Sequence, residues 1–495
     1  MMGKSGAGDW PADGHREPEQ ISRRDFLKAA GVAALSLGAE TAPPGADPSK
    51  PFVFSPEDNG LLDEIQEQTL KYFWDFGHPA SGMARERSNG IEAYDTDVVT
   101  TGGTGFGIMA MVVGVQREWL PRADTVKRIT RIVDFLSRPE TDKFHGVFPH
   151  WLDGKTGKAV PFSPMDDGAD LVETSFLMMG LLCARQYFQG KTSEEKDLRE
   201  KINQLWEAVD WQWHTRDGSN NLYWHWSPNH AWQKNMPISG WNECLVTHVL
   251  AASAPKPEHR VPPEVYHHGW ARHGAMKNGR SYHGTPLPLG PDGGGPLFFT
   301  QYSFMGLDPR GLKDAYADYW EQNCNHARIN YEHCVKNPRR HKGYGPNSWG
   351  LTASDDGDEG YAVHSPTEDS GVISPTAAAA TLPYLPKESL AALRRFREDE
   401  RIWRKDGYGF VDAFNADKGW YAKTYLAIDE GPIVGMIENA RTQLLWNLFM
   451  SCDEVKQGLK TLGFKSQLHL ESPDPVVSPF IENIRLAPQG FEHRP

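Results

Sequence analysis

"MDDGADLVETSFLMMGLLCARQYF", residues 165–188, joins a group of acidic residues to a long apolar segment. When the residues after Asp170 are placed on a helix, apolar side chains occupy nearly every face, so almost no polar face is left for solvent. Such a helix must be buried. We therefore expect the acids at its start, Asp166, Asp167, Asp170 and Glu173, to lie beside an enclosed part of the molecule.

Helical periodicity continues through most of the chain. Further helices are predicted near 61–76, 103–118, 122–137, 196–213, 239–252, 311–335, 372–380, 387–400 and 432–450. Strand-like alternation is scarce, and the long gaps between helices are rich in Gly, Pro, Trp and His. About ten helices without a coiled-coil heptad argue against a simple bundle. We predict an all-α fold, an (α/α)6 barrel with long functional loops.

The N-terminal segment has the pattern of an export signal. "SRRDFLKAAGVAALSLGA" (22–39) resembles a twin-arginine signal, and a short amphipathic helix is the alternative. We predict a signal peptide over 1–42, a linker over 43–58, one barrel domain over 59–465 and a polar tail over 466–495. The apolar run is too short for a permanent anchor. We therefore expect the twin-arginine translocase as an export partner and a periplasmic or secreted location.

Composition excludes several partners and cofactors. The 495 residues carry a formal net charge of −13 and no long run of like charge, so nucleic acid is not an expected partner. The five cysteines show no C-x-x-C pair and no Cys/His ligand spacing, which argues against structural zinc. The run "DDGDEG" (355–360) lacks the spacing and the closing Glu of an EF-hand, so calcium there is a minor alternative. We predict no metal and no cofactor.

Tryptophan is concentrated between residues 206 and 241, where seven of the 17 Trp residues fall. Most Trp side chains in globular proteins belong to the core. Stretches such as "NLYWHWSPNHAWQ" (221–233), however, mix Trp with Asn, His and Ser, as sites that stack on sugar rings and bind their hydroxyls do.

Carboxylates recur where apolar helices begin. Asp170 and Glu173 have the spacing of a capping box, and Glu243 precedes an apolar run. Pro432 is expected to be the first residue of a helix, which would place Asp429 just outside it. Each acid is consistent with a dipole-stabilised cap and also with a catalytic carboxyl, and the pattern alone does not decide between them.

Acids at helix starts, Trp-rich loops and an export signal, without a nucleophile elbow or a cofactor fingerprint, together indicate glycoside hydrolysis. That reaction needs one carboxylic acid to protonate the leaving oxygen and one carboxylate to activate water or attack the anomeric carbon.

Several long stretches resemble a known family, the bacterial glucoamylase-like proteins grouped with the endo-β-1,2-glucanases of glycoside hydrolase family 144. They are "DLVETSFLMMGLLCARQYF" (170–188), "GWNECLVTHVLAAS" (240–253), "GPLFFTQYSFMGLDPRG" (295–311), "KGYGPNSWGLTASD" (342–355), "DSGVISPTAAAATLPYLP" (369–386), "DGYGFVDAFN" (406–415) and "YLAIDEGPIVGMIENARTQLLWNLFM" (425–450). The resemblance implies an (α/α)6 barrel that hydrolyses linear β-1,2-glucan to sophoro-oligosaccharides without a cofactor.

The resemblance also implies roles for individual residues. Glu243 is the expected general acid and Asp429 the first choice for the base, with Asp170 and Glu173 as substrate-orienting groups or the alternative base. Arg87, or failing that Arg85, is expected to bind sugar hydroxyls, and a solvated surface arginine is the alternative. The other expected substrate-binding residues are Trp241, Tyr302, Tyr344, Trp349, Trp420 and Asp355.

Other functions compete with an endo-acting hydrolase. Related proteins release sophorose from chain ends or transfer sugars instead of hydrolysing. A non-catalytic periplasmic glycan-binding protein is the alternative of another class. A polysaccharide lyase is disfavoured, because its uronate substrates are polyanions and this acidic chain shows no basic cleft.

Overall fold

The computed structural model describes residues 52–88 and 97–470. The predicted signal peptide lies outside these residues, and so do most of the predicted linker and C-terminal tail. Within the described ranges, none of the helices combines the length and the apolar character needed to cross a bilayer.

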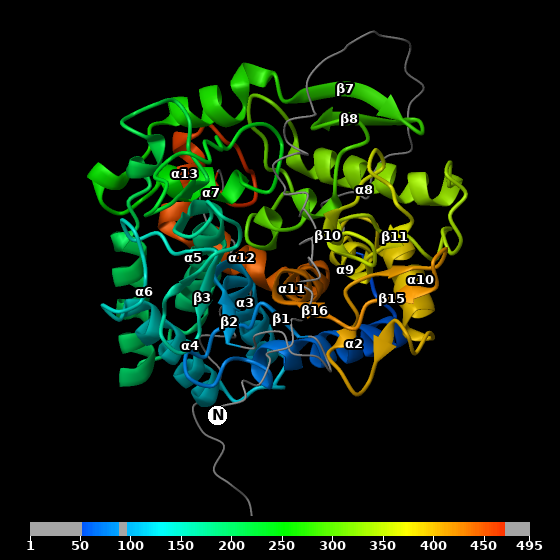
Figure 1. Cartoon of the computed structure of the whole chain (residues 1–495), viewed down its shortest axis with the longest axis horizontal. Helices are drawn as coiled ribbons and strands as arrows, with labels where there is room; N and C mark the ends of the chain where they lie inside the picture. The colour runs from blue at the N-terminus through cyan, green and yellow to red at the C-terminus, as the bar shows by residue number, and fades with distance from the viewer. Residues whose placement is uncertain (1–51, 89–96, 471–495) are drawn as a thin grey trace, which may run out of the picture.

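Helices make up most of the regular structure (Figure 1). They are α2 (Pro56–Trp74), α3 (Thr101–Gln116), α4 (Arg122–Ser137), α5 (Leu171–Tyr187), α6 (Ser193–Ala208), α7 (Leu245–Ala252), α8 (Tyr319–Lys336), α9 (Pro375–Ala380), α10 (Pro386–Arg397), α11 (Ala427–Thr442), α12 (Leu444–Ser451) and α13 (Asp453–Thr461). Every predicted helical run overlaps one of them, so the helix-rich fold is confirmed. α8 begins later than predicted because Asp318 caps it, accepting hydrogen bonds from the backbone N–H groups of Trp320 and Glu321.

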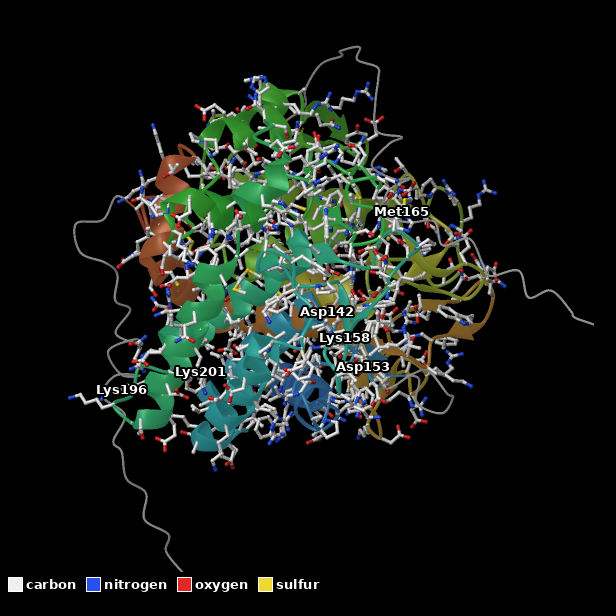
Figure 2. The ribbon with its side chains drawn as sticks, turned by 60° about the vertical axis from the view of Figure 1, so that its left-hand side comes forward. Asp142, Asp153, Lys158, Met165, Lys196 and Lys201 are labelled. Carbon is white, nitrogen blue, oxygen red and sulfur yellow. The ribbon has the colours of Figure 1, made fainter. Side chains whose placement is uncertain are left out.

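The helices are of two kinds. α3, α5, α7, α9 and α11 are buried along nearly their whole length, and α3 packs between α5 and α11. α4, α6 and α10 bury one face only and lie toward the edge of the molecule (Figure 1). On α6, Lys196 is exposed and points away from the protein (Figure 2). The fully apolar sequences therefore form an inner set of helices, and the amphipathic ones cover it.

α3 and α5 touch through their backbones. A Cβ added at Gly105 would lie 2.2 Å from the Phe176 carbonyl oxygen, and one added at Gly180 would lie 2.1 Å from the Gly105 carbonyl oxygen. No residue other than glycine fits at these two positions without separating the helices.

Short strands, which the all-α prediction left out, complete the fold. They are β1 (Arg87–Ser88), β2 (Val98–Thr100), β3 (Trp151–Asp153), β4 (Ala159–Val160), β5 (Ala169–Asp170), β6 (His225–Trp226), β7 (Lys277–Tyr282), β8 (Thr285–Leu289), β9 (Ala353–Asp356), β10 (Gly360–Val363), β11 (Val372–Ile373), β12 (Trp403–Arg404), β13 (Gly409–Phe410), β14 (Phe414–Asn415), β15 (Trp420–Tyr421) and β16 (Tyr425–Leu426). They pair antiparallel as β1–β16, β2–β3–β4, β5–β6, β7–β8, β9–β10, β11–β14–β15 and β12–β13.

Four of these strands lead directly into inner helices: β2 into α3, β5 into α5, β11 into α9 and β16 into α11. Their ladder hydrogen bonds satisfy backbone groups that a buried loop would leave unpaired. The strands therefore fix the place at which each inner helix starts.

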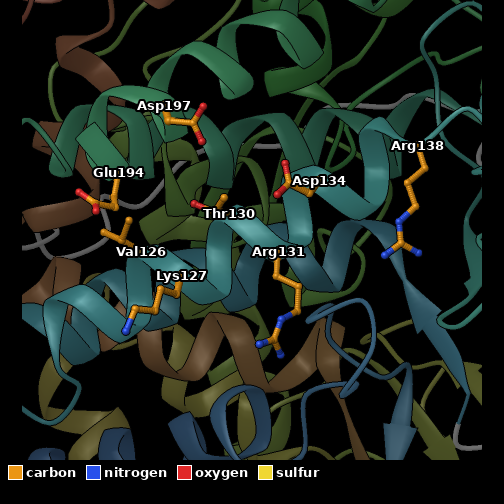
Figure 3. A pocket seen from close by; sticks show the side chains of 8 residues that line it. All are labelled: Val126, Lys127, Thr130, Arg131, Asp134, Arg138, Glu194 and Asp197. Atoms are coloured by element: carbon orange, nitrogen blue, oxygen red, sulfur yellow. The ribbon is translucent and has the colours of Figure 1, made fainter. Parts of the chain in front are cut away.

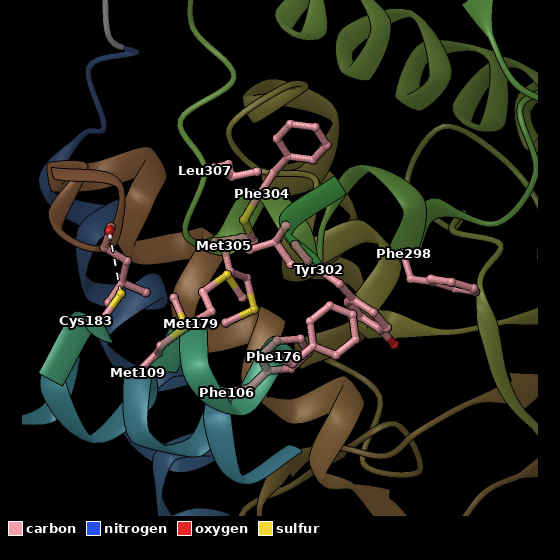
Figure 4. Packing of buried hydrophobic residues seen from close by; sticks show 14 of the residues in the cluster. Phe106, Met109, Phe176, Met179, Cys183, Phe298, Tyr302, Phe304, Met305 and Leu307 are labelled. Atoms are coloured by element: carbon pink, nitrogen blue, oxygen red, sulfur yellow. Dashed lines mark hydrogen bonds between the residues drawn. The ribbon is translucent and has the colours of Figure 1, made fainter. Parts of the chain in front are cut away.

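Aromatic rings fill the space between the inner helices. Phe106 on α3, Phe176 on α5 and Tyr302 pack with ring centroids 5.2 to 5.8 Å apart (Figure 4). The five cysteines are buried, and no disulfide joins them.

Candidate active site

The starts of the inner helices meet at one place. Glu173, in the first turn of α5, accepts a 2.9 Å hydrogen bond from the Gly102 N–H at the start of α3. The hydroxyls of Ser175 on α5 and Thr247 on α7 are 2.7 Å apart. A Cβ added at Gly103 would lie 2.7 Å from the Ala427 Cβ, the first residue of α11. The acids at the starts of α5, α7 and α11 therefore belong to one region.

Glu243 lies in the turn just before α7, which begins later than predicted, and its side chain is 2% exposed. Its backbone carbonyl accepts a hydrogen bond from the Ser303 hydroxyl, and the Ser303 hydroxyl oxygen in turn accepts one from the Val246 N–H at 3.0 Å. The neighbouring Tyr302 hydroxyl is 3.5 Å from Asp429 Oδ1. The adjacent residues 302 and 303 thus contact Asp429 and the backbone of Glu243, the residues that the family resemblance assigned as base and acid.

Asp429 is inside α11, which corrects the expected helix start at Pro432. α11 begins at Ala427, so Asp429 lies in its first turn. Pro432 is accommodated in the second turn, where it removes only one backbone hydrogen bond. The Thr376 hydroxyl on α9 donates to the Asp429 carbonyl at 2.6 Å and ties the two helix starts together.

Two further buried acids, Asp412 and Glu430, lie beside Asp429, and of these Asp412 was missed from the sequence. Burial, followed by the charge of Asp429, raises the pKa of both carboxyl groups well above the usual range. For Asp412 there was a usable signal, since a single acid in the apolar run "FVDAF" (410–414) is rarely buried without a role.

Asp170 does cap α5. Its Oδ1 accepts hydrogen bonds from the backbone N–H groups of Val172 and Glu173 at 3.0 and 2.9 Å. Its Oδ2 faces the Nδ1 atoms of His150 at 3.2 Å and His225 at 3.4 Å. Burial raises the pKa of Asp170 to about 6. Capping and a position in the acidic region are therefore compatible roles.

The two other acids of the opening stretch have different surroundings. Burial favours a higher pKa for Asp166, but His225 at 3.0 Å and Lys234 at 2.8 Å outweigh it and hold the pKa below the usual range. Asp167 is only half-buried and accepts a 2.6 Å hydrogen bond from the Asn229 side chain. Asp167 therefore stabilises the loop through Asn229, whereas Asp166 forms buried ion pairs with His225 and Lys234.

Arg87 is not the solvated arginine of the alternative interpretation. It lies on β1, and its Nη1 is 3.0 and 3.1 Å from the two carboxylate oxygens of Asp355. The Asp355 N–H donates to Asp412 at 2.6 Å. Arg87 and Asp355 are thereby placed beside the Asp412–Asp429 group.

The predicted aromatic residues divide into two groups. Trp241 and Tyr302 are buried beside the acidic region, while Tyr344 and Trp420 are half-buried, Tyr344 donating a 2.7 Å hydrogen bond to Asp369. Trp349 is 0% exposed, with its ring edge-on to Tyr331. Burial places Trp349 in the core and corrects the prediction that it is an open sugar platform, and the burial of Tyr302 and Trp241 argues equally against that role for them.

Replacing Trp349 by Ala is expected to lower the free energy of unfolding by about 3–5 kcal/mol, because a large cavity is left in the core. Urea unfolding measures this. The matched variant Trp420→Ala, at a half-buried ring, should lose much less stability. Equal stability of Trp349→Ala and the wild type would contradict the core assignment.

A hollow of about 420 Å³ lies elsewhere, between the outer helices α4 and α6 (Figure 3). It is lined by both basic and acidic side chains, among them Lys127, Arg131, Asp134 and Asp197. None of the predicted site residues lines it, and we assign it no catalytic role.

Comparison with known proteins agrees with this geometry. Residues 235–453 match the family model Glycoamylase, described as "Putative glucoamylase". A solved "putative glucoamylase" from Bacteroides uniformis is 50% identical, with a TM-score of 0.80, and the match covers 84% of this chain and 99% of that one. This chain belongs to the glucoamylase-like family.

Two relatives of this glucoamylase-like protein have named activities. An endo-β-1,2-glucanase from Chitinophaga pinensis, solved as a sophorotriose and glucose complex, is 51% identical, with a TM-score of 0.80 over 84% of this chain and 99% of that one. An exo β-1,2-glucooligosaccharide sophorohydrolase from Parabacteroides distasonis is 42% identical over 82% of this chain. The chain spans 58% of the length of that curated relative.

Proposed function

We propose that this glucoamylase-like protein is an exported glycoside hydrolase that cleaves linear β-1,2-glucan internally and releases sophoro-oligosaccharides. The observation that carries the proposal is that the adjacent residues Tyr302 and Ser303 contact Asp429 and the Glu243 backbone, in a chain 51% identical to an endo-β-1,2-glucanase. Release of sophorose from chain ends is the second candidate, because the relative at 42% identity is named for that activity.

In the proposed reaction Glu243 protonates the leaving glycosidic oxygen. The Ser303 hydroxyl bonds the Glu243 backbone and so fixes the point from which this carboxyl reaches the substrate. Asp429 activates the attacking water as general base, with Tyr302 donating to its Oδ1. Burial and the charge of Asp429 raise the pKa of Asp412 and Glu430, so both neighbours of the proposed base favour the protonated form.

The frame we propose for this site is an (α/α)6 barrel. The support is the inner set of buried helices, in which α3 contacts both α5 and α11, surrounded by amphipathic helices. We also propose export through the twin-arginine pathway to the periplasm or the exterior, on the pattern of residues 22–39.

The test is to incubate the purified protein with linear β-1,2-glucan and with β-1,3-, β-1,4- and α-1,4-glucans, following new reducing ends and product sizes. We expect cleavage of the β-1,2-glucan alone, because the relatives named for a substrate act on that linkage. A ladder of sophoro-oligosaccharides indicates internal cleavage, and sophorose alone indicates action at chain ends. Binding of the glucan without cleavage would favour the glycan-binding alternative.

A further inference from the structure

A buried chain of alternating charges reaches the acidic region from the Trp-rich segment. The Lys234 ammonium is 2.8 Å from Asp166 Oδ2, and Asp166 Oδ1 is 3.0 Å from His225 Nδ1. That same nitrogen is 3.4 Å from Asp170 Oδ2. His150 then spans from Asp170 at 3.2 Å to Glu173 at 3.8 Å. Five of these six residues are buried, and His150 is nearly so.

We propose that His225, held in place by Asp166 and Lys234, is a positioning residue that keeps Asp170 ionised and, through His150, fixes the place of Glu173. The activity tests of this inference rest on the proposed function. It adds Lys234, Asp166, His225 and His150 to the working parts of the site.

The first support is charge balance. Asp166 and Asp170 are both fully enclosed, and two buried carboxylates this close to one nitrogen are stable as anions only beside positive charge. Lys234 supplies one such charge. The titratable and charged groups that face Asp170 are His150, His225, Asp166, Lys234 and, on its own helix, Glu173.

The second support is the backbone. Asp170 is in β5 and His225 in β6, and the two residues are directly opposite each other in the β5–β6 pair. A displacement of His225 therefore moves the residue that caps α5, and with it Glu173, whose N–H bonds Asp170. The position of the first turn of α5 therefore depends on His225 and Lys234, the basic residues that the Trp-rich segment contributes to the network.

His150, Asp166 and Asp170 also present ligand atoms within 4.8 Å of one another, as a metal site would. The ammonium group of Lys234 on Asp166 already provides the positive charge that a cation would bring, which favours the network without a metal. Metal analysis of the protein separates the two arrangements.

The main test is His225→Asn. Asn keeps a donor near the Nδ1 position but carries no charge. We expect the acid limb of the kcat/KM profile on β-1,2-glucan to move to higher pH by about one unit, because an adjacent positive charge favours the ionised carboxyl. The rate at the optimum should fall about tenfold, with KM changed less than threefold, for a lost positioning interaction. Lys234→Met should move the limb in the same direction, and Lys234→Arg should restore it.

His214→Asn is the matched control. His214 is a buried histidine of the same segment whose Nδ1 contacts the Tyr223 carbonyl at 2.8 Å, and burial lowers its pKa to about 3. This variant should leave the acid limb unchanged. An unchanged limb in folded His225→Asn would overturn the inference, and so would about one bound zinc per wild-type chain, with the two histidines as ligands.

A second readout does not need activity. The pKa of Asp170 is raised in the fold to about 6, so this group contributes stability below its unfolded value, and the contribution is lost as pH rises to about 6. His225 lowers the pKa of Asp170, so in His225→Asn this pKa is higher still, and the stability that Asp170 contributes continues to fall at higher pH. The difference in unfolding midpoint between the wild type and His225→Asn should therefore grow above pH 6. A constant difference would overturn the inference even if the wild type cleaved no glucan.

Discussion

Glu243→Gln is expected to lower kcat/KM on linear β-1,2-glucan by about a thousandfold or more, because the amide cannot protonate the leaving oxygen. Gln has nearly the same shape, and the Ser303 contact is made to the backbone of residue 243, so the turn before α7 should keep its structure. The measurement is initial rates of reducing-end release, with circular dichroism to confirm folding.

Two controls separate acid catalysis from a structural role for Glu243. The exposed Glu264→Gln should be as active as the wild type. A sophoroside with a nitrophenol leaving group needs little protonation, so Glu243→Gln should retain far more of its activity on it than on the glucan. Equal losses on both substrates would assign Glu243 to binding instead.

Asp429→Asn is expected to reduce kcat by a similar factor, about a thousandfold, with a small change in KM. The loss of negative charge should also lower the pKa of Asp412 and Glu430, since Asp429 raises both. A nitrophenol leaving group should not rescue this variant, because water activation is still missing.

Asp170 and Glu173 are the competing candidates for the base, so Asp170→Asn and Glu173→Gln belong in the same experiment. The base should show the largest loss in kcat on the activated substrate. If Glu173→Gln loses more than Asp429→Asn, the base lies on α5 and Asp429 becomes a substrate-orienting group.

The sequence was most informative where hydrophobic pattern and helix capping act locally. The apolar run after Asp170 predicted a buried helix, and the acid before it both caps that helix and joins the acidic region. The acids at the starts of separate helices were selected on local pattern, and the structure places them in buried surroundings, while their catalytic roles stay predictions.

Features that depend on contacts between distant segments were not predictable in the same way. Trp349 has the sequence context of the other aromatic residues, and only packing shows that it is enclosed. Asp412 is brought beside Asp429 through its contact with Asp355, across a sequence gap that no local pattern spans. The start of α11 was misplaced because Pro432 is usually a first-turn residue, whereas here the β1–β16 pair fixes an earlier start.

The glycine contact between α3 and α5 has a consequence for redesign of this protein. Gly105 and Gly180 leave no adjustable side chains between the two helices, so the distance from the Gly102 N–H to Glu173 is set by backbone against backbone. Directed evolution for a new linkage or product length should therefore succeed through the loops that follow the short strands. Libraries that vary Gly105, Gly180 and the other residues between α3 and α5 would return mostly inactive clones.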